Sequence, residues 1–163
     1  MSNIGRVINA MIGYYTGDIR RINHFLKVYS FAKTIGELEG LDERTRLILE
    51  IAAVTHDIGI KNSEKKYNSS AGNYQQIEGP PEARRLLEDL GVDRSIIERV
   101  CWLIAHHHNY KDVRGSDYQI LLEADFLVNA FEDSMSVDSM IKFRNTIFKT
   151  ESGKRLLQAC FQL

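Results

Sequence analysis

The dipeptide His56-Asp57 carries the clearest chemical potential in the chain. It ends an apolar run with helical spacing, Leu47-Ile48-Leu49-Glu50-Ile51-Ala52-Ala53-Val54-Thr55. Burying an imidazole beside a carboxylate is costly unless something compensates the polar groups, and a divalent metal does so readily. Alternatively, a histidine at this place suits the negative end of a helix dipole. The dipeptide alone leaves both interpretations open.

Three further segments carry histidine or aspartate on helical faces that we expect to be buried. His24 shares a face with Val28 and Ile35, the run 106–108 contains three histidines, and Asp125 lies among apolar neighbours. Adjacent helical residues diverge by about 100°, so the three histidines do not all point inward. A backbone-bonded core histidine or a solvated helix end would explain each segment separately. Together they supply metal-ligating side chains from four helices, which a bundle can bring to one interior point.

Helical periodicity recurs along the whole chain and predicts an all-α fold, a single-domain helical bundle. In the first half of the chain, we expect a helix over 4–12, a second over 18–40 with Asp18 as its N-cap, and a third that Asp42 caps and that ends at the dipeptide. A fourth helix begins at Pro80-Pro81 and ends at Gly91, and Asp93 caps a fifth. The last three cover 117–133, 137–148 with Ser136 as N-cap, and 151–162 with Thr150 as N-cap. The stretch 60–79 lacks apolar periodicity, which predicts either a lid or substrate loop or a tolerated surface insertion.

The composition is typical of one globular domain over residues 1–163. The helices that carry the histidines and aspartates make a candidate metal-binding core at about 18–133, and we expect the helices at about 136–162 to cover it. Twenty-one basic and 22 acidic residues leave little net charge, which gives no support to nucleic-acid or membrane-surface binding. No apolar run approaches the roughly 20 residues of a membrane span, and the N-terminus lacks a signal-peptide layout. Cys101 and Cys160 lie in apolar helical patterns and are expected to be reduced core thiols in a cytoplasmic protein. The sequence leaves open whether the chain forms a homo-oligomer.

The order of these residues, H…HD…H…D, resembles the HD-domain superfamily of metal-dependent phosphohydrolases. The resemblance covers about residues 18–133, and its strongest local matches are Ala53-Val54-Thr55-His56-Asp57-Ile58-Gly59 and Glu123-Ala124-Asp125-Phe126-Leu127. It implies a metal site in the core of the bundle, with the primary metal held by His24, His56, Asp57 and Asp125. Nitrogen and oxygen ligands suit Mn, Fe, Ni, Co, Mg or Zn.

Members of the superfamily with two metals add a histidine in the helix after the lid and a His-His pair before the last aspartate. His107 and His108 resemble that pair, although His106-His107 fits equally well. The middle histidine is absent from the segment Gln75-Gln76-Ile77-Glu78-Gly79-Pro80, in which Glu78 is the candidate second-metal ligand. The expectation is therefore one metal, with a second metal left open.

The resemblance implies hydrolysis of a phosphate ester, with a nucleotide or another small phosphorylated metabolite as substrate. A metal-activated water attacks phosphorus, and Asp57 or Asp125 orients that water or takes its proton. Lys61, four residues after Asp57, is the best-placed cation for the developing negative charge, ahead of a weaker set: Lys65, Lys66, Arg20, Arg21 and Arg114.

Two departures from the family patterns disfavour two subclasses of the superfamily. Cyclic-dinucleotide phosphodiesterases carry Gly-Tyr-Pro after their His-His pair, where this chain has Asn109-Tyr110-Lys111-Asp112. Hydrolases of guanosine tetraphosphate carry a Glu-Asp pair soon after the His-Asp dipeptide, and this chain has no such pair there. Two alternatives stand beside hydrolysis. One is a di-iron oxygenase of the same superfamily, which the missing histidine disfavours. The other is a non-catalytic, metal-stabilised sensor or interaction module.

Overall fold

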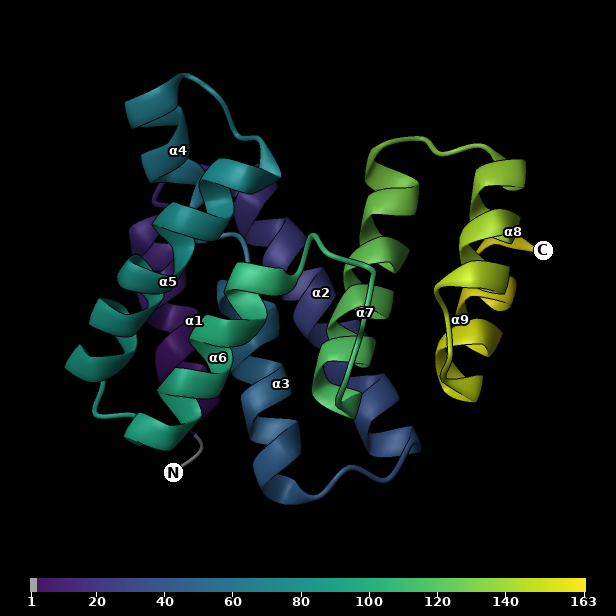
Figure 1. Cartoon of the computed structure of the whole chain (residues 1–163), viewed down its shortest axis with the longest axis horizontal. Helices are drawn as coiled ribbons and strands as arrows, with labels where there is room; N and C mark the ends of the chain where they lie inside the picture. Colours follow the sequence, from purple (N-terminus) through teal and green to yellow (C-terminus); the bar gives the residue numbers. More distant parts are fainter. Residues whose placement is uncertain (1–2) are drawn as a thin grey trace.

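The computed structural model describes residues 3–163, and this part of the chain contains helices and no strand (Figure 1). The helices are α1 (Asn3–Tyr14), α2 (Ile19–Leu38), α3 (Glu43–Thr55), α4 (Ile60–Tyr67), α5 (Gly72–Asp89), α6 (Arg94–His106), α7 (Ser116–Glu132), α8 (Val137–Thr146) and α9 (Glu151–Phe161). The prediction of an all-α fold is confirmed. Among the described residues, no helix combines the length and apolar character needed to cross a membrane.

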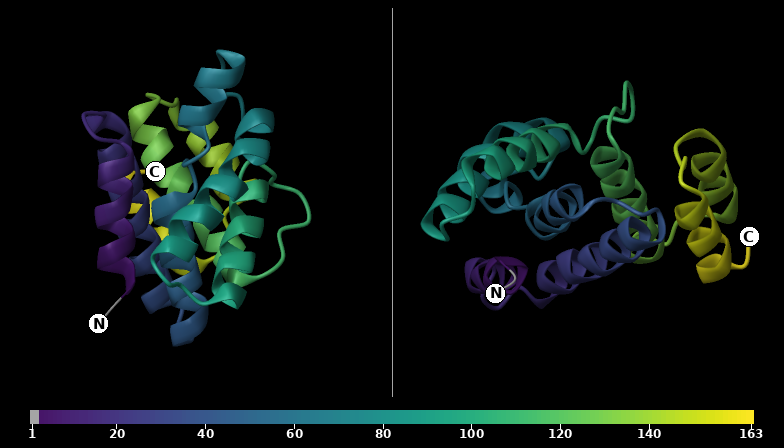
Figure 2. Two further views of the ribbon diagram at one scale, coloured as in Figure 1. Left: turned by 90° about the vertical axis from the view of Figure 1, so that its left-hand side faces the viewer. Right: turned by 90° about the horizontal axis from the view of Figure 1, so that it is seen from below.

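Helices α3 and α7 form the centre of the bundle. Every residue of α3 from Ile48 to Thr55 is buried, and α7 is buried along most of its length. A helix that is apolar on all sides needs neighbours on all sides. Helix α3 therefore packs against α1, α2, α6 and α7, while α5 lies along α6. Helices α8 and α9 lie beyond α7, on the side opposite to α5 and α6 (Figures 1 and 2).

The predicted N-caps explain where five helices begin. The side chains of Asp18, Asp42, Asp93, Ser136 and Thr150 each accept a hydrogen bond from a backbone N–H in the first turn of the helix that follows. Such a bond satisfies one of the donors that the first turn of a helix leaves without a partner. All five predictions are confirmed.

The predicted long loop over 60–79 is wrong. Residues 60–67 form α4, and α5 already begins at Gly72. The sequence of α4 shows no apolar periodicity, because the only residue that this helix buries is Ser63.

The prolines Pro80 and Pro81, predicted to start a helix, lie inside α5. A proline cannot donate to the carbonyl four residues earlier, which affects Gln76 and Ile77 here. Ile77 is 60% exposed and Gln76 half-buried, so water can bind these carbonyls and the helix continues.

Cys101 is buried as predicted, but the core position predicted for Cys160 is wrong, because that thiol is exposed. Only a narrow face of α9 packs against the bundle, with Ser152, Gly153 and Leu157 buried.

Glu123 attaches the start of α9 to α7. Its fully buried carboxylate accepts hydrogen bonds from the Thr150 hydroxyl at 2.7 Å and the Gln119 amide at 2.8 Å. The backbone N–H groups of Lys149 and Thr150 lie at 3.4 and 3.3 Å. Burial raises the pKa of Glu123 despite these donors.

We expect Glu123→Ala to lower the free energy of unfolding by about 2–3 kcal/mol, because half-buried donors of Gln119 and Thr150 would lose their acceptor. Thermal unfolding followed by circular dichroism measures this. The matched control is Glu88→Ala, which removes an exposed glutamate of α5 and should leave the midpoint nearly unchanged. Equal midpoints for Glu123→Ala and the unmodified protein would contradict the assigned anchoring role.

Candidate metal centre

His56 and Asp57 occupy the turn between α3 and α4, where local bonds hold both residues. The Nδ1 atom of His56 lies 2.8 Å from the carbonyl oxygen of Ala53, one turn earlier. The hydroxyl of Tyr15, which follows α1, donates to the carbonyl of Asp57 at 2.8 Å. The following residue, Gly59, receives bonds from the N–H and the hydroxyl of Ser63. The N-terminal helix thus fixes the turn that presents the dipeptide.

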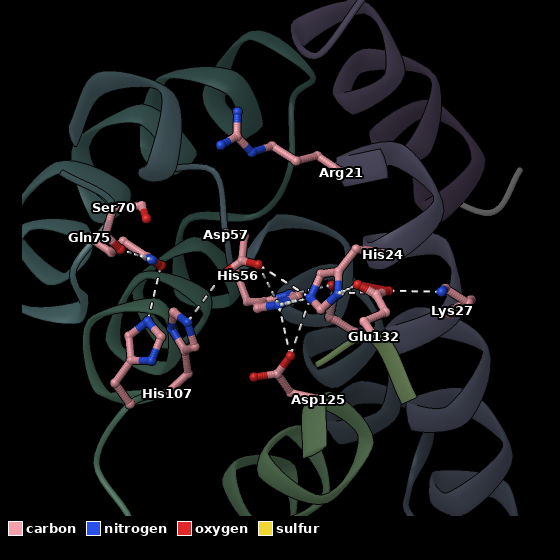
Figure 3. Close-up of polar contacts among 12 residues, drawn as sticks. Arg21, His24, Lys27, His56, Asp57, Ser70, Gln75, His107, Asp125 and Glu132 are labelled. Atoms are coloured by element: carbon pink, nitrogen blue, oxygen red, sulfur yellow. Dashed lines mark hydrogen bonds and ion pairs between the residues drawn. The ribbon is translucent and has the colours of Figure 1, made fainter. Parts of the chain in front are cut away.

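The side chains of His24, His56, Asp57 and Asp125 converge from α2, the turn after α3, and α7 (Figure 3). His24 Nε2 lies 3.3 Å from His56 Nε2, from Asp57 Oδ2 and from Asp125 Oδ1. His56 Nε2 lies 3.3 Å from Asp57 Oδ2 and 3.4 Å from Asp125 Oδ1. Ligand atoms that are each about 2.1 Å from one metal ion lie roughly 3.0–3.5 Å from one another. These separations therefore fit a shared cation.

Acceptors outside the cluster orient two of these imidazoles. The Nδ1 atom of His24 lies 3.2 Å from both carboxylate oxygens of Glu132, and Oε1 of this carboxylate also lies 2.8 Å from Lys27 Nζ (Figure 3). His56 Nδ1 faces a backbone carbonyl. A proton on each Nδ1 leaves the Nε2 lone pairs facing the carboxylates, which is the arrangement of metal-ligating histidines.

The electrostatics of the cluster favour a positive charge at its centre. Burial disfavours a charged imidazole, yet Asp125 and Asp57 outweigh this and raise the pKa of His24 to about 9. The pKa of Asp57 lies well below its usual range, because neighbouring imidazoles outweigh the effect of burial. Among the described residues, His107 Nε2 and Asp125 Oδ1 are buried side-chain atoms without a hydrogen-bond partner. A cation beside His24 and His56 would satisfy Asp125 Oδ1, and a cation beside His108 would satisfy His107 Nε2.

Asp57 also belongs to a second group, with His107 and His108. One ligand atom from each of these residues lies within 4.8 Å of the others. His107 Nε2 is 3.4 Å from Asp57 Oδ1, and its Nδ1 is 2.8 Å from the carbonyl of Ile104. His106 points elsewhere, because its ring stacks on Trp102 with centroids 3.9 Å apart. Of the two registers that the sequence left open, the structure brings His107 and His108 to Asp57.

Gln75 and not Glu78 reaches this second group from α5. The amide oxygen of Gln75 lies 3.0 Å from His108 Nε2, and its amide nitrogen donates to the carbonyl of Ser70. The carboxylate of Glu78 is held by Lys66 at 2.9 and 3.1 Å and by the Tyr67 hydroxyl at 3.0 Å. Glu78 therefore stands apart from both groups of potential ligands.

Lys61, the predicted catalytic cation, points to α1 instead of the cluster. Its Nζ donates to the carbonyl of Tyr14 at 3.0 Å and lies 4.8 Å from the centre of the Tyr14 ring. The structure therefore does not bring Lys61, which the sequence suggested as a catalytic cation, to the cluster. Arg20 and Arg21, weaker candidates from the sequence, line the pocket beside His24 and Asp57.

The cluster opens into a pocket of about 520 Å³, lined by Asp18, Arg20, Arg21, His24, Asp57, Ile60, Glu64, Ser70, Asn129, Glu132 and Asp133. The Asp57 side chain is 22% exposed and so connects the buried cluster with this pocket. Five carboxylates and two guanidinium groups line it. Arg21 is paired with Asp18 at 2.9 Å and with Glu64. An anionic ligand would be repelled here unless a metal supplied positive charge.

Sequence reasoning missed two residues that contact the cluster, Glu132 and Gln75. Glu132 lies in the last turn of α7, where a surface glutamate is unremarkable, and only the packing of α7 on α2 brings it to His24. For Gln75 a signal existed, because it lies in the segment that should contain the missing histidine.

Comparisons with known proteins agree with this geometry. A model of the HD-domain family matches residues 21–138, which is more than half of the chain. The chain therefore belongs to the HD-domain family. This confirms the resemblance that the order of its histidines and aspartates along the sequence indicated.

A solved structure has the same fold. The crystal structure of a predicted HD superfamily hydrolase from an uncultured Thermotogales bacterium is similar, with a TM-score of 0.67 and 21% sequence identity over 96% of this chain and 84% of that chain. No curated protein matches the sequence.

Proposed function

We propose that this HD-domain protein is a metal-dependent hydrolase of phosphate esters, acting on a nucleotide or another small phosphorylated metabolite. The observation that carries the proposal is the convergence of His24, His56, Asp57 and Asp125 at separations of 3.3–3.4 Å beside an open pocket. Two imidazoles and two carboxylates are ligands that suit a divalent metal used in hydrolysis. The matching HD-domain model and the similar hydrolase fold support this choice.

In the proposed site, these four residues hold the primary metal, and Glu132 fixes the ring of His24. Such an ion would supply Lewis acidity there, which would lower the pKa of water and offset negative charge on a phosphate. Asp57 is the residue that we assign to orienting the attacking water and accepting its proton, because its carboxylate extends from the cluster into the pocket. Asp125 is more enclosed, with 11% of its side chain exposed, and serves as ligand.

We assign the recognition of substrate phosphate to Arg20 and Arg21 in place of Lys61. Both arginines lie in the first turn of α2, where the N-terminal end of the helix adds partial positive charge. Arg21 is positioned by Asp18 and Glu64 at the wall of the pocket. A planar guanidinium presents donors in a fixed fork that matches two phosphate oxygens. Both terminal nitrogens of Arg21 are held by Asp18 and Glu64, so a phosphate bound to Arg21 would replace one of these carboxylates.

A phosphatase panel tests the proposed function. The purified protein, loaded in turn with Mn, Ni, Co, Mg or Zn, is given nucleoside monophosphates, simple phosphomonoesters and phosphodiesters, and phosphate or alcohol release is measured. We expect metal-dependent turnover that is lost in His56→Ala. Metal binding by the unmodified protein without turnover above His56→Ala on any ester would refute hydrolysis and favour a sensor module.

Gln75 is expected to limit the centre to one tightly bound metal. A neutral amide oxygen is a weaker ligand for transition metals than an imidazole. Replacing Gln75 with histidine next to His108 should therefore raise the bound metal from one to two equivalents per chain. Elemental analysis after gentle purification measures the ratio. The matched control is Gln76→His, which adds a half-buried histidine one residue away on α5. A ratio unchanged by Gln75→His, or raised equally by both variants, would contradict this role.

A further inference from the structure

A second pocket of about 500 Å³ adjoins the metal pocket across helix α7. It is lined by Tyr110, Phe126, Asn129, Asp133, Met135, Ser139, Lys142, Phe143, Thr146 and Ile147. Asn129 and Asp133, one helical turn apart on α7, line both pockets. The two pockets therefore adjoin at Asn129 and Asp133.

Aromatic rings form the wall of this second pocket. The rings of Phe126 and Phe143 stack with centroids 3.7 Å apart and an angle of 8° between their planes. Tyr110 meets Phe143 edge-on at 5.2 Å and 89°. Tyr110 is 43% exposed, so part of the wall is open to a ligand. Such a surface, mostly apolar with a few polar groups, is typical of sites that bind a planar organic ring.

Two of these residues lie close to the metal cluster. Phe126 directly follows Asp125, and Asn129 lies one turn beyond Asp125, about 6 Å further along the helix axis. The aromatic wall therefore begins within one helical turn of a proposed metal ligand.

We propose that this aromatic pocket is a subsite for the base of a nucleoside monophosphate whose phosphate lies at the metal cluster. This inference rests on the proposed phosphohydrolase function and adds the part of the substrate that distinguishes nucleotides from other esters. The base packs against Tyr110 and Phe143, while Asn129 and Asp133 lie between the subsites, where the hydroxyl groups of the sugar can bond to them. Lys142 adds a donor at the rim for ring acceptors.

The kinetic test compares an ester that has a base with one that lacks it. We expect Tyr110→Ala to lower kcat/KM for nucleoside monophosphates on the order of tenfold through a higher KM, because the base loses a stacking partner. For glycerol phosphate, kcat/KM should change less than about twofold. Phe143→Ala should act in the same direction. The matched control is Phe131→Ala, which removes a ring that is 74% exposed and lines a different pocket of α7.

A binding measurement keeps this inference separate from the proposed function. Saturation-transfer NMR with adenosine, guanosine, cytidine and uridine needs no turnover, and we expect a signal that Tyr110→Ala weakens and Phe131→Ala leaves intact. Nucleoside binding that depends on Tyr110, without hydrolysis of any ester, would support the subsite and refute the hydrolase. Hydrolysis of both esters with equal effects of Tyr110→Ala, and no nucleoside signal, would overturn the subsite and leave the hydrolase standing.

Discussion

Asp57→Asn is expected to remove the bound metal and to lower hydrolysis of a phosphate ester on the order of 10³-fold. Asp57 is the residue common to both groups of potential ligands, and its oxygens lie 3.3–3.4 Å from His24, His56 and His107. Asparagine keeps the shape but loses the negative charge that balances a divalent ion. It also cannot accept the proton of the attacking water. A loss of several kcal/mol of charge stabilisation corresponds to a change of this order in rate.

Metal content by elemental analysis and kcat/KM on the best ester of the panel should fall together in Asp57→Asn. The matched control is Asp138→Asn, at an exposed position of α8. Circular dichroism should show an intact helical fold for both variants. Full activity of Asp57→Asn, or lost activity with metal content unchanged, would contradict the role that we assign to Asp57 as a ligand.

The second large effect is expected from Gly59→Ala, which should lower the free energy of unfolding by about 3 kcal/mol. A Cβ atom at Gly59 would lie 2.7 Å from the backbone nitrogen of Gly79 and 2.9 Å from the carbonyl oxygen of Gln75. Both are backbone atoms of α5, so the whole helix must shift to admit a methyl group. In a chain of 163 residues this predicts a fall in Tm of about 6–12 °C.

The shift of α5 should also weaken metal binding, because Gly59 lies two residues after Asp57 and packs against Gln75, which contacts His108. Thermal unfolding and metal titration measure the two effects. The matched control is Gly13→Ala in α1, where an added Cβ has no atom within 4 Å among the described residues. That variant should be unchanged or slightly stabilised, since alanine favours a helix more than glycine does. A Tm for Gly59→Ala within 2 °C of the unmodified protein would refute the close approach of the two backbones.

Local patterns were sufficient to predict most helices, because apolar spacing and capping side chains act within a few residues. Asp18, Asp42 and Asp93 begin helices as expected, since each cap bonds a donor in its own first turn. The exceptions are α4 and the start of α5. Their stability depends on docking, with Gly59 packed on Gly79 and Ser63 buried, and such contacts leave no apolar period in the sequence.

The sequence by itself determined the types and the order of the side chains that the structure brings together: His24, His56-Asp57, the histidine run and Asp125. Each lies on a face whose apolar neighbours require burial, and burial of several such groups favours a common cation. The family followed from the same order.

Only the tertiary structure decided which neighbouring residues take part. His107 and His108 turn to Asp57 while His106 stacks on Trp102, and Lys61 turns to Tyr14. The physical reason is that a side chain's direction depends on the rotation of its helix and on partners far away in the chain. The pairing of Glu132 with His24 joins residues that are 108 positions apart. For His56-Asp57, the dipeptide alone left a helix-end pair and a metal site open, and the order of the other histidines and aspartates favoured the metal. The structure adds the distances at which α2 and α7 bring His24 and Asp125 to this dipeptide.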